Sequence, residues 1–99
     1  MPEPLQPSII FDIDFADDES VSAESAAADA TDEFQAALES IPCRAQHPDP
    51  VVEYCEDEQA VWLRGTVWLP SYDESAARAA IAHMDAWALT LGFDITAHP

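Results

Sequence analysis

Between positions 9 and 15, every second residue of the chain is hydrophobic. The series is Ile9, Phe11, Ile13 and Phe15, with Ile10, Asp12 and Asp14 at the intervening positions. Successive side chains of a strand point to opposite faces, so this period of two predicts a strand buried on one side. Residues 1–7 contain three prolines and show no period. We therefore expect a flexible leader over residues 1–7 and a single folded domain over residues 8–99.

After position 20 the hydrophobic spacing changes to a helical period, which predicts a helix over about residues 21–41. Its apolar stripe comprises Ala23, Ala27, Ala30, Phe34, Ala37, Leu38 and Ile41. The opposite side carries the acids Glu24, Asp29, Asp32, Glu33 and Glu39. Before the helix, carboxylates and a capping hydroxyl are expected from Asp17, Asp18, Glu19 and Ser20. No basic residue lies along the helix, so intrahelical ion pairs do not account for its acids.

Two further strands are predicted over residues 51–55 and 60–69, joined by an acidic hairpin tip. The tip consists of Glu56, Asp57, Glu58 and Gln59. One face of the second strand carries Val61, Leu63, Val67 and Leu69, and the other carries Trp62, Arg64, Thr66 and Trp68. Both faces of this strand therefore contain bulky side chains.

A second helix is predicted from a capping box at residues 71–74 to about Leu91. Its expected buried stripe comprises Ala77, Ala80, Ile81, Met84, Trp87, Ala88 and Leu91. Gly92 suits the C-cap, and residues 93–97 alternate as a last strand with Phe93, Ile95 and Ala97 inward.

The resulting order, β-α-β-β-α-β, predicts an α+β fold of the ferredoxin-like type, with two helices on one face of a four-stranded antiparallel sheet. The other face of the sheet would be open. It would display Asp12, Asp14, Trp62, Arg64, Trp68 and Asp94, with either Tyr54 or Glu53 according to the register. Exposed tryptophans indicate a contact surface, which a partner, the leader or a second copy of the chain could cover.

Charge narrows the range of functions more than any motif does. Twenty Asp and Glu stand against three Arg and no Lys, for a formal net charge of −17 over 99 residues. A field of this sign repels phosphate backbones and attracts basic surfaces, so we expect no direct binding of nucleic acid. Residues 1–58 carry sixteen of the acids, an asymmetry that favours a functional acidic face over a uniform adaptation to salt.

Catalytic and metal-binding patterns are weak. Residues 9–14 resemble the D-x-D opening of haloacid-dehalogenase-type phosphatases, but Phe15 stands at that family's Gly position and the chain has no Lys. Asp12, Asp14, Asp17 and Asp18 could in principle hold a hard cation, although a strand end before a capped helix accounts for the same acids. Cys43 and Cys55 lack zinc-site spacing and are expected to be free thiols. His47, His83 and His98 form no metal-binding pair. We expect no enzyme activity, metal or cofactor.

These observations predict a non-catalytic acidic protein that inhibits a basic nucleic-acid-handling partner by occupying its nucleic-acid site. The expected contact residues are Asp17, Asp18, Glu19, Glu24, Asp29, Asp32, Glu33, Glu39, Glu56, Asp57 and Glu58. The sheet face, with Asp12, Asp14, Trp62, Arg64 and Trp68, is a second candidate contact, or the interface of a homodimer. A domain from a salt-adapted organism is the other alternative. No signal peptide or membrane span is evident, so the expected compartment is the cytoplasm.

In character the chain resembles small acidic phage proteins that act against host defence and acidic immunity proteins that neutralise nucleases. A narrower resemblance rests on the order of elements, on Leu69-Pro70-Ser71 leading into the second helix and on Leu91-Gly92-Phe93 leading into the last strand. Over residues 8–99 this resembles the regulator B family of ribonuclease E inhibitors. The resemblance implies a ferredoxin-like fold and inhibition of an RNA-degrading enzyme by direct binding.

Overall fold

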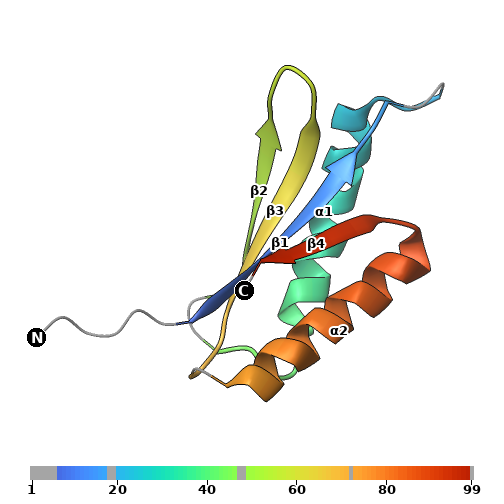
Figure 1. Ribbon diagram of the computed structural model, residues 1–99. Coiled ribbons are helices and arrows are strands. Elements are labelled where there is room, and N and C mark those ends of the chain that lie inside the picture. The colour runs from blue at the N-terminus through green and yellow to red at the C-terminus, as the bar shows by residue number, and fades with distance from the viewer. Residues whose placement is uncertain (1–6, 18–19, 47–48, 72, 99) are drawn as a thin grey trace, which may run out of the picture.

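The chain folds as a four-stranded sheet with both helices on one of its faces (Figure 1). The computed structural model describes residues 7–17, 20–46, 49–71 and 73–98. In chain order the elements are β1 (Ser8–Phe15), α1 (Ala23–Glu39), β2 (Val51–Glu56), β3 (Val61–Trp68), α2 (Glu74–Leu91) and β4 (Asp94–His98). The predicted ferredoxin-like α+β architecture is confirmed.

All strand pairs in the sheet are antiparallel, in the order β2-β3-β1-β4. Ile13, at the centre of β1, lies opposite Leu63 of β3 and opposite Ile95 of β4. Residues directly opposite one another share a face of the sheet. Because Glu53 lies opposite Arg64, Glu53 is on the open face and Tyr54 is on the helix side.

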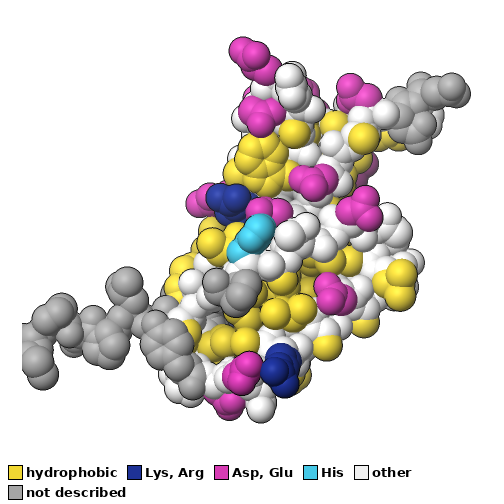
Figure 2. All heavy atoms as spheres, viewed as in Figure 1, with side chains coloured by type: hydrophobic (Ala, Val, Ile, Leu, Met, Phe, Trp, Pro, Cys, Tyr) yellow, Lys and Arg dark blue, Asp and Glu magenta, His cyan; other side chains and the backbone are white. Residues whose placement is uncertain are grey.

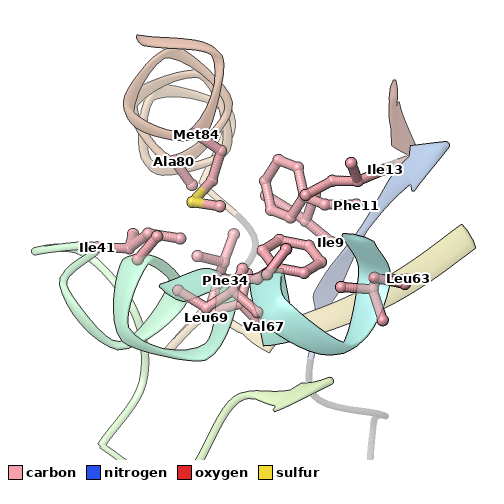
Figure 3. Close-up of a cluster of buried hydrophobic side chains, with 14 residues drawn as sticks. Ile9, Phe11, Ile13, Phe34, Ile41, Leu63, Val67, Leu69, Ala80 and Met84 are labelled. Carbon is pink, nitrogen blue, oxygen red and sulfur yellow. The ribbon is translucent and has the colours of Figure 1, made fainter. Parts of the chain in front are cut away.

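The core lies between the sheet and α1, with α2 closing one side (Figure 3). Every residue of the predicted α1 stripe is buried, and Phe34 and Leu38 have no exposed surface. The ring of Phe34 stacks on that of Trp87 from α2, with centroids 5.6 Å apart and an interplanar angle of 9°. The strand residue beneath α1 is Gly65. A Cβ there would lie 2.6 Å from Leu38 Cδ1 and 2.7 Å from Phe34 Cζ, so glycine permits the close approach of helix to sheet.

The predicted start of α1 was wrong by two residues. The N-cap is Ser22, whose hydroxyl accepts from Ser25 N at 3.2 Å, while Ser20 lies outside the helix. Asp17 Oδ1 accepts from Ala23 N at 2.9 Å, which adds a second capping bond. The carboxylate expected near this helix end is thus present, but it acts through a hydrogen bond from six residues away.

Helix α2 also begins later than the capping box predicts. Its N-cap is Asp73, which accepts from Ser75 N at 2.9 Å. Of its predicted stripe, Ala80, Met84 and Ala88 are buried, whereas Leu91 is 44% exposed because it lies in the last turn of α2, just before the chain turns at Gly92 into β4. Gly92 has φ of 75°, the left-handed conformation expected of the C-cap.

Several smaller predictions can also be compared with the structure. Cys43 and Cys55 are free and partly buried, as expected. Of the predicted leader, residues 1–6 lie outside the described part of the chain, and the carbonyl of Pro7 accepts from Leu69 N at 2.9 Å. Sheet-like pairing therefore begins just before Ser8. None of the helices in the described ranges is long and apolar enough to cross a membrane.

Candidate functional site

The outer side of α1 presents the acids that the sequence placed there. All five, namely Glu24, Asp29, Asp32, Glu33 and Glu39, are exposed. They occupy about half of the helix circumference, opposite the buried stripe, because each residue advances the helix by about 100°. We call this set the α1 acidic face. It is held in place by the best-packed helix of the fold.

The three arginines leave the α1 acidic face without a cationic partner. Arg64 pairs with Asp12 at 2.9 Å, and Arg78 pairs with Glu74 at 3.1 Å on α2. Arg44 donates to the backbone carbonyls of Glu39 and Ala45, each at 2.9 Å. Among the residues that the structure describes, no ion pair involves an acid of α1.

A second group of acids surrounds a shallow hollow of about 470 Å³ at one end of the fold. The hollow lies between the end of β1, the start of α1 and the β2–β3 hairpin, and the acids lining it are Asp14, Asp17, Glu24, Asp57 and Glu58. Figure 2 shows acidic side chains, in magenta, gathered at this hairpin end. The hollow adjoins the α1 acidic face through Glu24. Asp18 and Glu19, also predicted contacts, lie outside the described residues.

Two of these acids already have structural partners. Asp57 Oδ1 accepts from the backbone N–H groups of Gln59 and Ala60, at 2.8 and 2.7 Å, and so closes the hairpin turn. Asp17 caps α1 in the same manner. Sequence reasoning placed Asp17 before this helix without predicting its hydrogen bond. It missed the role of Asp57, although an Asp at the start of a turn is a recognised signal for such a bond. Among the described residues, no side-chain hydrogen bond or ion pair engages the carboxylates of Asp14, Glu24 and Glu58 near the hollow.

Tyr54 reports the electrostatic field between the hairpin and α1. Loss of hydration, a hydrogen bond from its hydroxyl to Glu56 at 3.1 Å and the charges of Glu56 and Glu24 raise the pKa of Tyr54 above its ordinary value. Negative charge disfavours the tyrosinate form. Carboxylates from β2 and α1 therefore act on the same point of the surface.

The open face of the sheet carries a different arrangement. Arg64 donates one hydrogen bond to each oxygen of Asp12, to Oδ1 at 2.9 Å and to Oδ2 at 3.2 Å, and His98 Nε2 lies 3.3 Å from the same Oδ2. The bond to Asp12 raises the pKa of Arg64, and the carboxylate of Asp12 is only 14% exposed. Asp12 and Arg64, predicted as contacts, thus satisfy each other, while Trp62 and Trp68 remain partly exposed.

The described residues offer little for metal chemistry. No group of three or more His, Cys, Asp or Glu side chains within them is placed to hold a metal ion. Of the histidines, His83 lies 2.8 Å from the hydroxyl of Ser40, and His47 is outside the described ranges. What the arrangement offers is an acidic exterior together with a partly apolar sheet face.

Comparison with known proteins adds information on the fold alone. No model of a known protein family matches the chain, and no curated protein matches it. Among solved structures it is similar to the de novo designed protein Ferredog-Diesel, with a TM-score of 0.50 and 14% identity. The similarity covers 100% of this chain and 91% of the designed one. This agrees with the ferredoxin-like topology.

Proposed function

We propose that this chain is a non-catalytic binding protein that inhibits a basic, nucleic-acid-handling partner by occupying the partner's nucleic-acid site. The observation that supports the proposal is the α1 acidic face, five exposed carboxylates that no side chain in the described ranges neutralises. Uncompensated surface charge lowers stability by self-repulsion. An excess of negative charge on one side of the protein is explained if a cationic partner neutralises it there.

The spacing of these acids suits imitation of a nucleic-acid strand. From Glu24 to Glu39 an α-helix rises about 22 Å, at roughly 1.5 Å per residue. The four intervals between these five charges average about 5–6 Å along the axis, of the same order as the roughly 3.4 Å of helix axis per phosphate in one DNA strand. A groove lined with Arg and Lys for a phosphate backbone would therefore meet a comparable line of charge.

The class of partner follows from this complementarity: a nuclease, an RNA-guided effector or a nucleic-acid-binding regulator. The resemblance to the regulator B family favours an RNA-degrading enzyme within that class. The hairpin end, with Glu24 and Glu58 beside the hollow, would extend the contact beyond the helix.

Capture from a host lysate at low and high salt tests the proposal. We expect a basic nucleic-acid-binding protein to be retained by the wild type at low salt and released as salt screens the charges. The double variant Asp29→Asn, Glu33→Gln should retain less. Its matched control, Glu74→Gln with Asp85→Asn, makes the same change in net charge on α2 and should retain as much as the wild type.

Competition then tests the mode of inhibition. Once the partner is identified, its nucleic acid and this chain should exclude each other, and activity should fall in proportion to occupancy. A complex that contains both ligands at once would contradict occupation of the nucleic-acid site.

The alternative of a salt-adapted domain gives a different result. Such a domain should lose its fold as salt is lowered, since screening would be needed to hold its acids together. We expect instead that thermal unfolding midpoints change little with dilution of salt, whereas partner binding strengthens. A midpoint that falls sharply at low salt would favour the alternative.

A further inference from the structure

The open sheet face has one end at which aromatic and acidic side chains adjoin. The register places Cys55, Trp62, Asp14 and Asp94 in one row across the four strands, in the order β2, β3, β1, β4. Asp14 lies directly opposite Trp62 on one side and directly opposite Asp94 on the other. Figure 2 shows hydrophobic side chains, in yellow, between acidic ones at the hairpin end.

The pairing of Asp14 with Asp94 is unfavourable for the isolated protein. Residues directly opposite in an antiparallel pair have Cβ atoms only about 4.5–5.5 Å apart, and like charges at that spacing destabilise the sheet. Both residues are exposed. The basic side chains of this face, Arg64 and His98, both contact Asp12, which lies one row further along the strands. Within the described ranges, neither Asp14 nor Asp94 therefore has an ion-pair partner.

We propose that this end of the sheet face, formed by Trp62, Asp14 and Asp94, binds an arginine side chain of a partner protein. A guanidinium group stacks on an aromatic ring and also pairs with carboxylates, so this surface matches both of its properties. A second copy of the chain is a poor occupant because the contact would bring Asp14, Asp94 and Glu53 against acids. Residues 1–6 contain no basic residue to place there.

The inference rests on the proposed function in that it supplies a second contact for the same basic partner. It differs in chemistry, because the α1 acidic face attracts any cation, whereas a tryptophan beside a pair of carboxylates selects guanidinium over ammonium. The sheet face would then anchor one arginine while the helix follows the remaining charge.

An NMR titration with a blocked tri-arginine peptide tests the inference without the natural partner. The indole N–H of Trp62 should shift, and at lower concentration than with tri-lysine, while that of Trp68 should not. Trp68 is a matched control because it lies on the same strand and face, paired with Ser8 and away from Asp14 and Asp94. In Trp62→Ala, affinity followed at the amides of Asp14 and Asp94 should fall roughly threefold to tenfold.

A variant that keeps the ring gives a second test. Asp94→Asn should raise the thermal midpoint by relieving the like-charge pair and yet weaken tri-arginine binding at Trp62, a combination that a purely structural role would not produce. Asp85→Asn, an equal charge change on exposed α2 surface, should do neither.

The outcomes separate the two proposals. Shifts confined to α1 would overturn the sheet-face site and leave the proposed function standing. Tri-arginine shifts at Trp62 that persist unchanged in the Asp29→Asn, Glu33→Gln variant would support the sheet-face site. If the same variant also captured the lysate partner as well as the wild type does, that second result would count against α1 as the main contact and would leave the sheet-face site supported. Shifts at Trp62 produced by protein concentration alone would identify a self-interface and overturn the arginine site.

Discussion

The two helices cover the same face of the sheet but differ in burial and charge. Helix α1 buries six residues and carries five exposed acids, none of which forms an ion pair within the described ranges, whereas α2 buries three residues and offsets Glu74 with Arg78. The helix with the most repulsive surface is therefore the one with the largest buried stripe. Strong packing on one side allows the other side of α1 to carry charge that does nothing for folding.

The difference has a local cause in the sheet. Gly65 lies beneath α1, and without a Cβ it lets Phe34 and Leu38 approach the strand closely. Helix α2 lies over the β1 and β4 side, where its contacts include the stack of Trp87 on Phe34 and the packing of Trp87 against Phe93. Substitutions on the inner side of α1 should therefore lower stability, and substitutions on its outer side should weaken partner binding.

The largest effect should come from Phe34→Ala. The side chain is fully buried between sheet and α2, so its loss should cost about 3–5 kcal/mol of unfolding free energy, measured by urea denaturation. Leu89→Ala on α2 is the control. Its side chain is 82% exposed, and a change within about 0.5 kcal/mol is expected. Similar losses in both variants would contradict the burial of Phe34 in the core beneath α1.

Gly65→Ala should cause the next largest loss of unfolding free energy. A methyl group there would overlap Leu38 Cδ1 and Phe34 Cζ, and the resulting crowding should cost about 1–3 kcal/mol. The same denaturation experiment measures it. A neutral result would mean that α1 does not depend on close approach to β3.

Two acids near α1 should respond differently to removal. Asp17→Ala removes the bond from Ala23 N and should cost about 1 kcal/mol, because a helix N-terminus loses a cap. Asp29→Ala removes an exposed acid from the helix interior and should leave stability unchanged or slightly higher. Equal thermal midpoints for the two variants would argue against dividing these acids into structural and free groups.

The smallest expected effect is a change in the pKa of Tyr54. The pKa of Tyr54 should lie above its ordinary value of 10.0, and Glu56→Gln should lower it. The pKa of Tyr54 is higher in the folded than in the unfolded protein. The contribution of Tyr54 to the free energy of unfolding is therefore present below the unfolded pKa and is lost as pH rises through the folded pKa. Ultraviolet absorbance of tyrosinate measures the titration, and Tyr54→Phe assigns it. A pKa indifferent to Glu56 would mean that the hairpin charges do not act there.

Hydrophobic periodicity was enough to predict the order of elements and which face of β1, β3 and α1 is buried, but it left open whether Glu53 or Tyr54 of β2 lies on the open face. The whole α1 stripe from Ala23 to Ile41 is buried as expected. Periodicity predicts which side of a helix faces the core, but not how far along the helix the covering surface extends. The pattern therefore predicts that Leu91 is buried, whereas it is exposed in the last turn of α2 before Gly92.

Caps and side-chain pairs were harder to predict. Several neighbouring residues could cap each helix, and the backbone path decides that Ser22 and Asp73 do so. The link between Asp12, Arg64 and His98 joins residues on three strands, so it depends on a register that the sequence pattern does not specify. The exposure of the α1 acidic face was easier to predict, because residues opposite the buried stripe of a helix lie on its outer side.

The central claim is that the outer side of α1 carries the electrostatic contact with a basic partner. The most direct test is the salt dependence of the partner's dissociation constant for the wild type, Asp29→Asn with Glu33→Gln, and Glu74→Gln with Asp85→Asn. We expect steep weakening with salt for the wild type and the α2 variant, and weaker, flatter binding for the α1 variant. Equal slopes and affinities for the α1 and α2 variants would contradict the claim.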